Sequence, residues 1–206
     1  MSTSGYLDSP WPGEDGGPQR LQIPRSGAGL NLQSGETLGC VTRHTLMSTM
    51  TVLGAPGEVY LLTHSALRAN LGLPTSACVE LIDPLTLKTR YRSPRLKGGP
   101  MWPGGMAIHR NGDLYVVYGR YAHRLNRACE PLAIHRLPVD LPYNSFVILD
   151  NGLLVTKNLS DSVNARISVL DPQTLQPVCA DIDCPEPSIA RLSSVGNTLY
   201  VVGVRS

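Results

Sequence analysis

A short pattern recurs along this chain: two apolar runs joined by a glycine-containing turn. Its clearest copy is Met106–His109 and Leu114–Tyr118, with Asn111-Gly112 between them. Asn-Gly between apolar runs predicts a β-hairpin, because both residues tolerate the positive φ of a type I′ turn. Three further copies pair Met50–Leu53 with Val59–Leu62, Phe146–Leu149 with Leu153–Thr156, and Ile189–Leu192 with Leu199–Val202.

The hairpins return at a nearly constant interval. Their turn glycines, Gly57, Gly112, Gly152 and Gly196, lie 55, 40 and 44 residues apart. Self-similarity at this period in an all-β pattern is typical of the blades of a β-propeller, each of which is a four-stranded antiparallel sheet. The spacing therefore predicts a propeller built from repeated hairpins.

A second marker repeats with the first. Asp83-Pro84-Leu85-Thr86-Leu87 returns as Asp171-Pro172-Gln173-Thr174-Leu175, 88 residues later, and Glu130-Pro131-Leu132 takes the same place between them. Asp followed by Pro suits a turn, since the carboxylate can accept hydrogen bonds from backbone amides and Pro presets φ. We expect these turns to join the third and fourth strands of each blade.

The fold class expected is all-β, with about three and a half four-stranded blades at 41–206 after an irregular Pro/Gly-rich segment at 1–40. In the first blade, the expected strands are Met50–Leu53, Val59–Thr63, Cys78–Ile82 and Thr89–Arg92. Closed propellers have about four to eight blades. The chain is therefore expected to be part of a six- to eight-bladed propeller, or to associate with another copy through the apolar edge Thr198–Val202.

Composition excludes several classes of protein. The formal net charge of +2 is too small for a nucleic-acid footprint. No apolar run is long enough to span a membrane, and the first residues lack the apolar centre of a signal peptide. We expect a cytoplasmic protein with no membrane partner, whose five cysteines are free thiols.

Two stretches carry a resemblance to a known family. ISVLDPQTLQPV and PEPSIARLSSVGNTLYVVG, at 167–178 and 185–203, resemble the repeat of the Tyr-Val-Thr-Asn group of β-propellers. The resemblance implies the propeller fold and leaves the activity open, because such repeats specify fold far better than function.

A narrower similarity suggests a metal site. YNSFVILDNGLLVTKN, at 143–158, is similar to the inner-strand motif of calcium-dependent six-bladed hydrolases of the gluconolactonase and paraoxonase type. It implies a Ca²⁺ ligand at Asn144. Asn158 and Glu186, expected at the same end of the blades, are further candidates, whereas Gly105 and Ser188 occupy the positions equivalent to Asn144 in other blades.

Basic residues stand near the end of each second strand: His64, Arg120, Lys157 and Arg205. Such a ring would favour an anionic ligand, although loops also carry solvated charges. Trp102 and Tyr143, in loops that lead into inner strands, are candidates for stacking on a ligand or for packing over the core.

Two hypotheses follow. The first is a propeller scaffold or ligand-binding module without chemistry of its own, with a small anion or a protein as partner. The alternative is a calcium-dependent hydrolase or lactonase with its site at the channel mouth. The residues leave open whether the protein is an enzyme.

Overall fold

The computed structural model describes residues 4–23, 33–45, 48–64, 67–68, 71–99 and 104–205, apart from the side chains of Ser48, Thr49 and Asn144. These residues form an all-β structure of strands β1 to β15 in four antiparallel sheets, with one short 3-10 helix, η1 (Glu14–Gly16). No helix in this part of the chain is long and apolar enough to cross a membrane.

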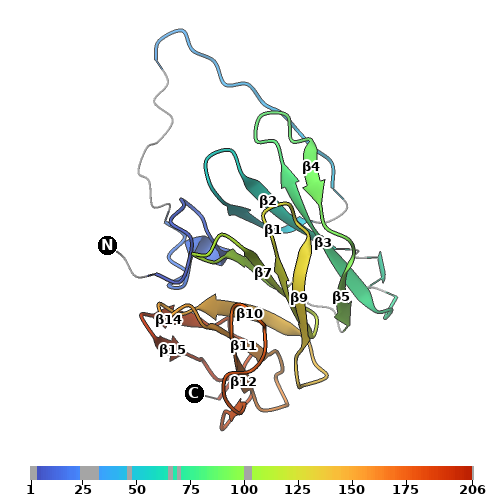
Figure 1. Cartoon of the computed structure of the whole chain (residues 1–206), viewed down its shortest axis with the longest axis vertical. Helices are drawn as coiled ribbons and strands as arrows, with labels where there is room; N and C mark the ends of the chain where they lie inside the picture. The colour runs from blue at the N-terminus through green and yellow to red at the C-terminus, as the bar shows by residue number, and fades with distance from the viewer. Residues whose placement is uncertain are drawn as a thin grey trace.

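The sheets follow one another in chain order (Figure 1). Sheet one contains β1 (Ser48–Leu53), β2 (Val59–His64), β3 (Thr75–Ile82) and β4 (Thr89–Arg92), with β5 (Leu96–Gly99) also paired to β3. Sheet two contains β6 (Gly105–Ile108), β7 (Leu114–Tyr118), β8 (Tyr121–Leu125) and β9 (Pro131–Arg136). Sheet three contains β10 (Tyr143–Ile148), β11 (Leu154–Asn158), β12 (Arg166–Leu170) and β13 (Ile182–Asp183). Sheet four contains β14 (Ser193–Val195) and β15 (Thr198–Tyr200).

Three of the four expected hairpins lie within three residues of their predicted positions, and the predicted strand order of the first sheet is confirmed. The fourth differs. Its first strand is β14, whereas Ile189–Leu192 was expected, because a two-residue turn at Gly196-Asn197 forces Val195 to pair directly with Thr198. Of the predicted apolar run, Leu192 is buried but Ile189 is 56% exposed.

The Asp-Pro turns have the predicted hydrogen bonds. The Asp83 carboxylate accepts from the amides of Leu85 and Thr86 at 2.9 and 2.8 Å. The Asp171 carboxylate accepts from Gln173 and Thr174 at 2.9 and 2.8 Å.

The expected equivalent at Glu130–Leu132 is wrong, because the turn in sheet two begins four residues earlier, at Asn126. The Asn126 side-chain oxygen accepts hydrogen bonds from the amides of Ala128 and Glu130. Each turn carries one non-glycine residue of positive φ, namely Leu87, Cys129 and Leu175. These three turns therefore resemble one another more closely in structure than in sequence.

The core lies between the sheets. Along β7, Leu114, Val116 and Tyr118 face sheet one, while Tyr115 and Val117 face sheet three. All five side chains are buried, as expected for a second strand that is apolar on both faces. A third cluster, which includes Val147, Val155 and Leu192, fills the space between sheets three and four.

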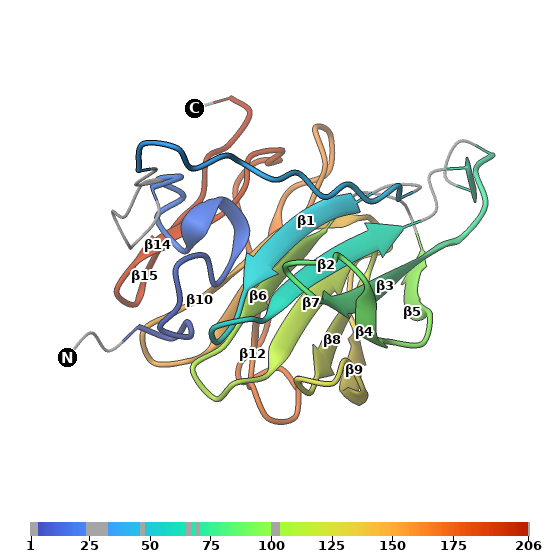
Figure 2. The ribbon, with the colours of Figure 1, turned by 90° about the horizontal axis from the view of Figure 1, so that it is seen from above.

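The N-terminal segment at 4–20 runs along the first strands of the sheets (Figure 2). The carbonyl oxygen of Trp11 accepts a hydrogen bond from Leu53, that of Pro12 from Ile108, and that of Pro18 from Ser194. Half-buried Trp11 thus lies against β1. Leu21 and Ile23, at the end of this described stretch, are outside any strand and mostly exposed.

Candidate functional site

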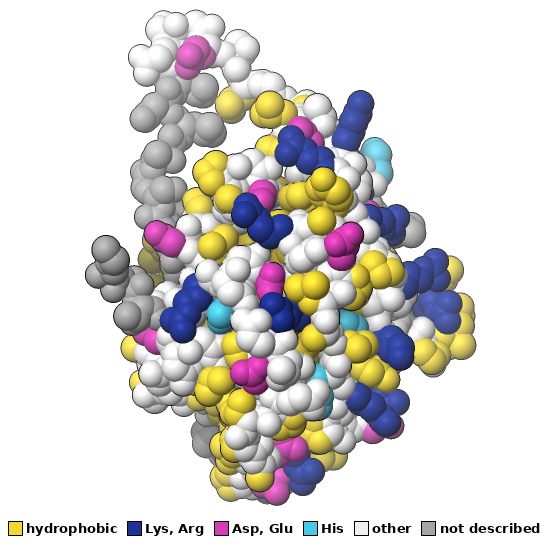
Figure 3. All heavy atoms as spheres, in the orientation of Figure 1, with side chains coloured by type: hydrophobic (Ala, Val, Ile, Leu, Met, Phe, Trp, Pro, Cys, Tyr) yellow, Lys and Arg dark blue, Asp and Glu magenta, His cyan; other side chains and the backbone are white. Residues whose placement is uncertain are grey.

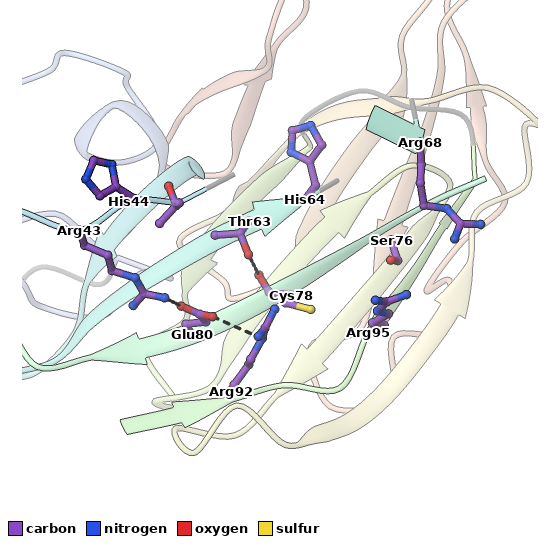
Figure 4. Close-up of a pocket in the computed structure, with 11 residues that line it drawn as sticks. Arg43, His44, Thr63, His64, Arg68, Ser76, Cys78, Glu80, Arg92 and Arg95 are labelled. Carbon is purple, nitrogen blue, oxygen red and sulfur yellow. Dashed lines mark hydrogen bonds and ion pairs between the residues drawn. The ribbon is translucent and has the colours of Figure 1, made fainter. Parts of the chain in front are cut away.

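Several charged side chains surround one hollow on the outer face of sheet one. This hollow, here called the sheet-one groove, has a volume of about 410 Å³. It is lined by Arg43, His44, Thr45, Thr63, His64, Arg68, Ser76, Cys78, Glu80, Arg92 and Arg95. They come from the chain before β1, from β2 and β3 and the connection between these two strands, and from β4 and the residues after it (Figure 4).

Strand alternation makes this face polar. Leu62, Val79 and Leu81 point toward sheet two and join its apolar core. Their neighbours face the other way, and the register pairs Thr63 with Cys78 and Glu80 with Arg92. Sheet one therefore has one apolar face and one that presents hydroxyl, thiol and charged groups.

One end of the groove is held together by a buried carboxylate. Glu80 is 4% exposed. It forms ion pairs with Arg43 and, at 3.3 Å, with Arg92, and it accepts a hydrogen bond of 3.3 Å from the Thr89 hydroxyl. Arg43 also donates to the Leu87 carbonyl, so it fastens the chain before β1 across the sheet. Glu80 thereby fixes two of the groove's four arginines.

The other end has uncompensated positive charge. In Figure 4, Arg68 and Arg95 lie on either side of Ser76. The Arg68 Nε donates to the carbonyl oxygen of Pro74 at 3.1 Å. In the part of the chain that the structure describes, the Arg95 guanidinium has neither an ion pair nor a hydrogen bond. An anion placed between these two guanidinium groups would receive charge-assisted hydrogen bonds.

His64, expected in a basic ring, lies at the edge of this groove but on the apolar side of β2. Its ring is 5.9 Å from that of Tyr118, and burial lowers its pKa. Neither ring nitrogen has a hydrogen-bond partner among the described residues. His64 is therefore a neutral packing residue near pH 7 rather than a fixed positive charge.

Two of the other three members of the expected ring are engaged elsewhere. Arg120 forms an ion pair with Asp140. Lys157 is fully buried and donates to the carbonyl oxygens of Ser188 at 3.0 Å and Asn158 at 3.5 Å. Burial lowers the pKa of its ammonium group to about 8. Arg205 remains exposed.

The aromatic candidates are placed as follows. Tyr143 is fully buried, and its hydroxyl oxygen accepts a hydrogen bond from the Val139 amide at 3.2 Å. Burial raises the pKa of its phenol to about 12. This side chain packs in the core in the present structure, while Trp102 lies outside the described residues.

The calcium candidates lie at one end of sheet three. Asn144 belongs to β10, and its side chain is outside the described part. The Asn158 side-chain oxygen accepts a hydrogen bond of 2.7 Å from the Arg166 amide, and the Glu186 carboxylate accepts one of 2.8 Å from the Arg205 amide. Within the described ranges, no three His, Cys, Asp or Glu side chains form a group that could hold a metal.

The groove was not predicted from the sequence. A usable signal was present in β3, where Glu80 interrupts an apolar run and Ser76 and Cys78 alternate with buried residues. The four arginines come from separate segments, so their convergence depends on the tertiary fold. A search with protein-family models and a search of curated proteins found no match to this chain.

Proposed function

We propose that the protein is a binding module of β-propeller type, without chemistry of its own, that holds a small anion in the sheet-one groove. The observation that carries the proposal is the pair Arg68 and Arg95 beside Ser76, at the end of the groove that Glu80 does not neutralise.

The arrangement of the sheets supports a propeller-type module. The first strands β1, β6 and β10 contact one another in chain order. The interface of sheet two with sheet one and that of sheet two with sheet three are each filled by side chains that alternate along the strands of the facing sheets. Radially arranged blades have their first strands together in the same way.

The side chains of the groove favour binding over catalysis. Cys78 is the only strong nucleophile type among the lining residues, and no hydrogen bond from a described histidine activates its thiol. The one carboxylate, Glu80, is buried in ion pairs. Arginine and hydroxyl groups remain, and these recognise phosphate or carboxylate groups.

Isothermal titration with inorganic pyrophosphate and with citrate tests this function. We expect binding that weakens with salt, and a loss of about tenfold to hundredfold in affinity for Arg95→Gln, since hydrogen bonds to charged groups contribute about 1.5–3 kcal/mol. Arg136→Gln, which removes an exposed arginine at the end of β9, is the matched control. No binding of either anion at millimolar concentration, or equal losses in both variants, would refute the proposal.

A further inference from the structure

The sheet-one groove carries more positive charge than a singly charged anion neutralises. Its described lining has four arginines and one carboxylate, that of Glu80. The arginines are Arg43, Arg68, Arg92 and Arg95. With the histidines counted as neutral, the net charge of this lining is +3. Figure 3 shows basic side chains along the side of the molecule on which β3 and β5 lie. The summed potential therefore favours a ligand with several negative charges.

The positive charges stand at two places along β3. Ser76, Cys78 and Glu80 alternate on one face of this strand and lie in a row in Figure 4. Arg68 and Arg95 lie beside Ser76. Ser76 and Glu80 are four residues apart in the sequence, which corresponds to about 13 Å at about 3.3 Å per residue. A single phosphate group forms hydrogen bonds of about 2.7–2.9 Å to arginine, so it does not bridge the two places.

Arg92 supplies free hydrogen-bond donors at the Glu80 end. Its Nε lies 3.3 Å from a Glu80 carboxylate oxygen, and its side chain is 60% exposed. In the described part of the chain, its two Nη atoms have no protein partner. Arg43 differs, because one of its Nη atoms donates to Glu80 and the other to the Leu87 carbonyl. Arg92 is therefore a second anchor point, separate from Arg68 and Arg95.

The lining between these anchor points is polar and uncharged. It includes the hydroxyl groups of Thr63 and Ser76 and the thiol of Cys78. The Thr63 hydroxyl donates to the Cys78 carbonyl at 3.4 Å. The Ser76 hydroxyl has no partner among the residues that the structure describes. A ligand that is polar along its whole length suits this lining, since its buried oxygens need hydrogen bonds in place of those to water.

We infer that the ligand of the sheet-one groove is a linear oligophosphate of three or more phosphoryl groups, either free or as the tail of a nucleotide. One end of the phosphate chain lies between Arg68 and Arg95, beside the Ser76 hydroxyl, and the other end reaches Arg92. Each phosphoryl group carries at least one negative charge at neutral pH, so three of them match the net charge of the lining. The inference rests on the proposed anion-binding function and adds the chemical class of the ligand.

An acidic peptide is the other elongated polyanion, and the sheet does not favour it. Extended peptides gain affinity through backbone hydrogen bonds to a free strand edge. β3 has no free edge here, since it pairs with β2 on one side and with β4 and β5 on the other. A peptide lying on this face would direct its own N–H donors at arginines, which are donors only. Phosphoryl oxygens are acceptors only and match these groups.

The test is isothermal titration of the full chain with pyrophosphate and tripolyphosphate in magnesium-free buffer. We expect tripolyphosphate to bind at least about tenfold more tightly, because it also reaches Arg92. Arg92→Gln should weaken tripolyphosphate binding about tenfold and change pyrophosphate binding by less than about threefold. Arg90→Gln is the matched control, since it removes the same charge from the same strand and Arg90 pairs with Asp83 outside the groove.

The outcomes separate this inference from the proposed function. If the wild-type protein binds neither phosphate chain at millimolar concentration, the proposed function itself is refuted. If pyrophosphate binds as tightly as tripolyphosphate, only the present inference is overturned. An equal loss of tripolyphosphate binding in Arg90→Gln, or a tetraglutamate peptide that binds as tightly as tripolyphosphate, would also overturn it.

A titration with ATP identifies the source of the phosphate chain. Tighter binding of ATP than of tripolyphosphate would assign the chain to a nucleotide, whereas equal or weaker binding would assign it to free oligophosphate. Circular dichroism verifies that both arginine variants fold. The comparison of the two phosphate chains on wild-type protein decides the inference even if Arg92→Gln does not fold.

Discussion

The phenol oxygen of Tyr6 accepts a hydrogen bond of 3.1 Å from the backbone amide of Ile148, 142 residues further along the chain. Both residues are buried. Tyr6 also forms a β-bridge with His109, so the N-terminal segment joins sheet two to sheet three. A segment without regular strands thus contributes to the packing of the repeated sheets.

Tyr6→Phe removes this acceptor and leaves the Ile148 amide buried without its partner. We expect the free energy of unfolding to fall by about 1–3 kcal/mol, the usual cost of an unsatisfied buried donor. Urea denaturation followed by circular dichroism measures the change. Tyr91→Phe, at a half-exposed tyrosine, should change stability little. Equal stability of Tyr6→Phe and wild type would mean that the segment does not support the core.

Acid should destabilise the fold through His123. Its ring is buried, and Nε2 lies 2.8 Å from the carbonyl oxygen of Lys97. Burial lowers the pKa of His123 to about 4, against about 6.5 in the unfolded chain. Between these values the unfolded state binds more protons, so stability present above pH 6.5 is lost as the pH falls toward 4, by up to roughly 3 kcal/mol.

Urea denaturation of wild type and His123→Gln across this pH range tests the assignment. The variant should lose less stability than wild type between pH 6.5 and pH 4. His44→Gln, at an exposed histidine, should follow the wild-type curve. If His123→Gln loses as much stability as wild type between pH 6.5 and pH 4, acid destabilises the fold through other groups.

The strands were largely predictable because their signals are local. Asn111-Gly112 fixes one turn, Asp83 and Asp171 fix two others, and the apolar runs beside them have the right length for strands. The first strand of the fourth hairpin was predicted at Ile189–Leu192 from its apolar residues. The two-residue turn at Gly196-Asn197 instead sets the pairing, so the strand lies nearer the turn.

Elements that depend on distant contacts were not predictable. β5 reads Leu-Lys-Gly-Gly, which has no strand pattern, yet it pairs with β3. A Cβ atom on Gly98 would lie 2.6 Å from the Tyr118 ring, so only glycine permits this approach. The N-terminal segment is similar, because Trp11 and Pro12 bind strands through backbone oxygens that every residue type has.

The candidate site shows the same limit. A charge near a strand end was visible in the sequence for Arg120 and Lys157, but whether it faces solvent was not. Arg120 forms an ion pair with Asp140, and Lys157 is fully buried. The groove arginines, such as Arg43 and Arg95, lie about 50 residues apart, and only the folded sheet brings them to one hollow.

Calcium should not raise the melting temperature of this protein if it is a binding module. Asn158 already uses its side-chain oxygen for the Arg166 amide and its nitrogen for the Asn164 carbonyl. A thermal-shift scan to about 5 mM calcium covers the weak end of biological affinities. A calcium-dependent rise that Asn144→Ala abolishes, and that the turn variant Asn111→Ala retains, would instead favour the hydrolase-like alternative.

Lys157→Met should stabilise the protein near neutral pH. The ammonium group is fully buried, and burial lowers its pKa to about 8 from about 10.5 in the unfolded chain. Below pH 8 both states are protonated, so the folded state carries the full cost of the buried charge, roughly 3 kcal/mol. Between pH 8 and pH 10.5 the unfolded state binds more protons, and wild-type stability therefore rises with pH.

Methionine fills a similar volume without the charge, but it forfeits the hydrogen bonds to Ser188 and Asn158. We therefore expect Lys157→Met to gain about 1–3 kcal/mol of stability at pH 7. The gain should shrink steadily to pH 10.5 in urea denaturation, while Lys88→Met, at an exposed lysine, shows no such trend. A difference between wild type and Lys157→Met that stays constant with pH would mean that Lys157 keeps its ordinary pKa in the folded protein.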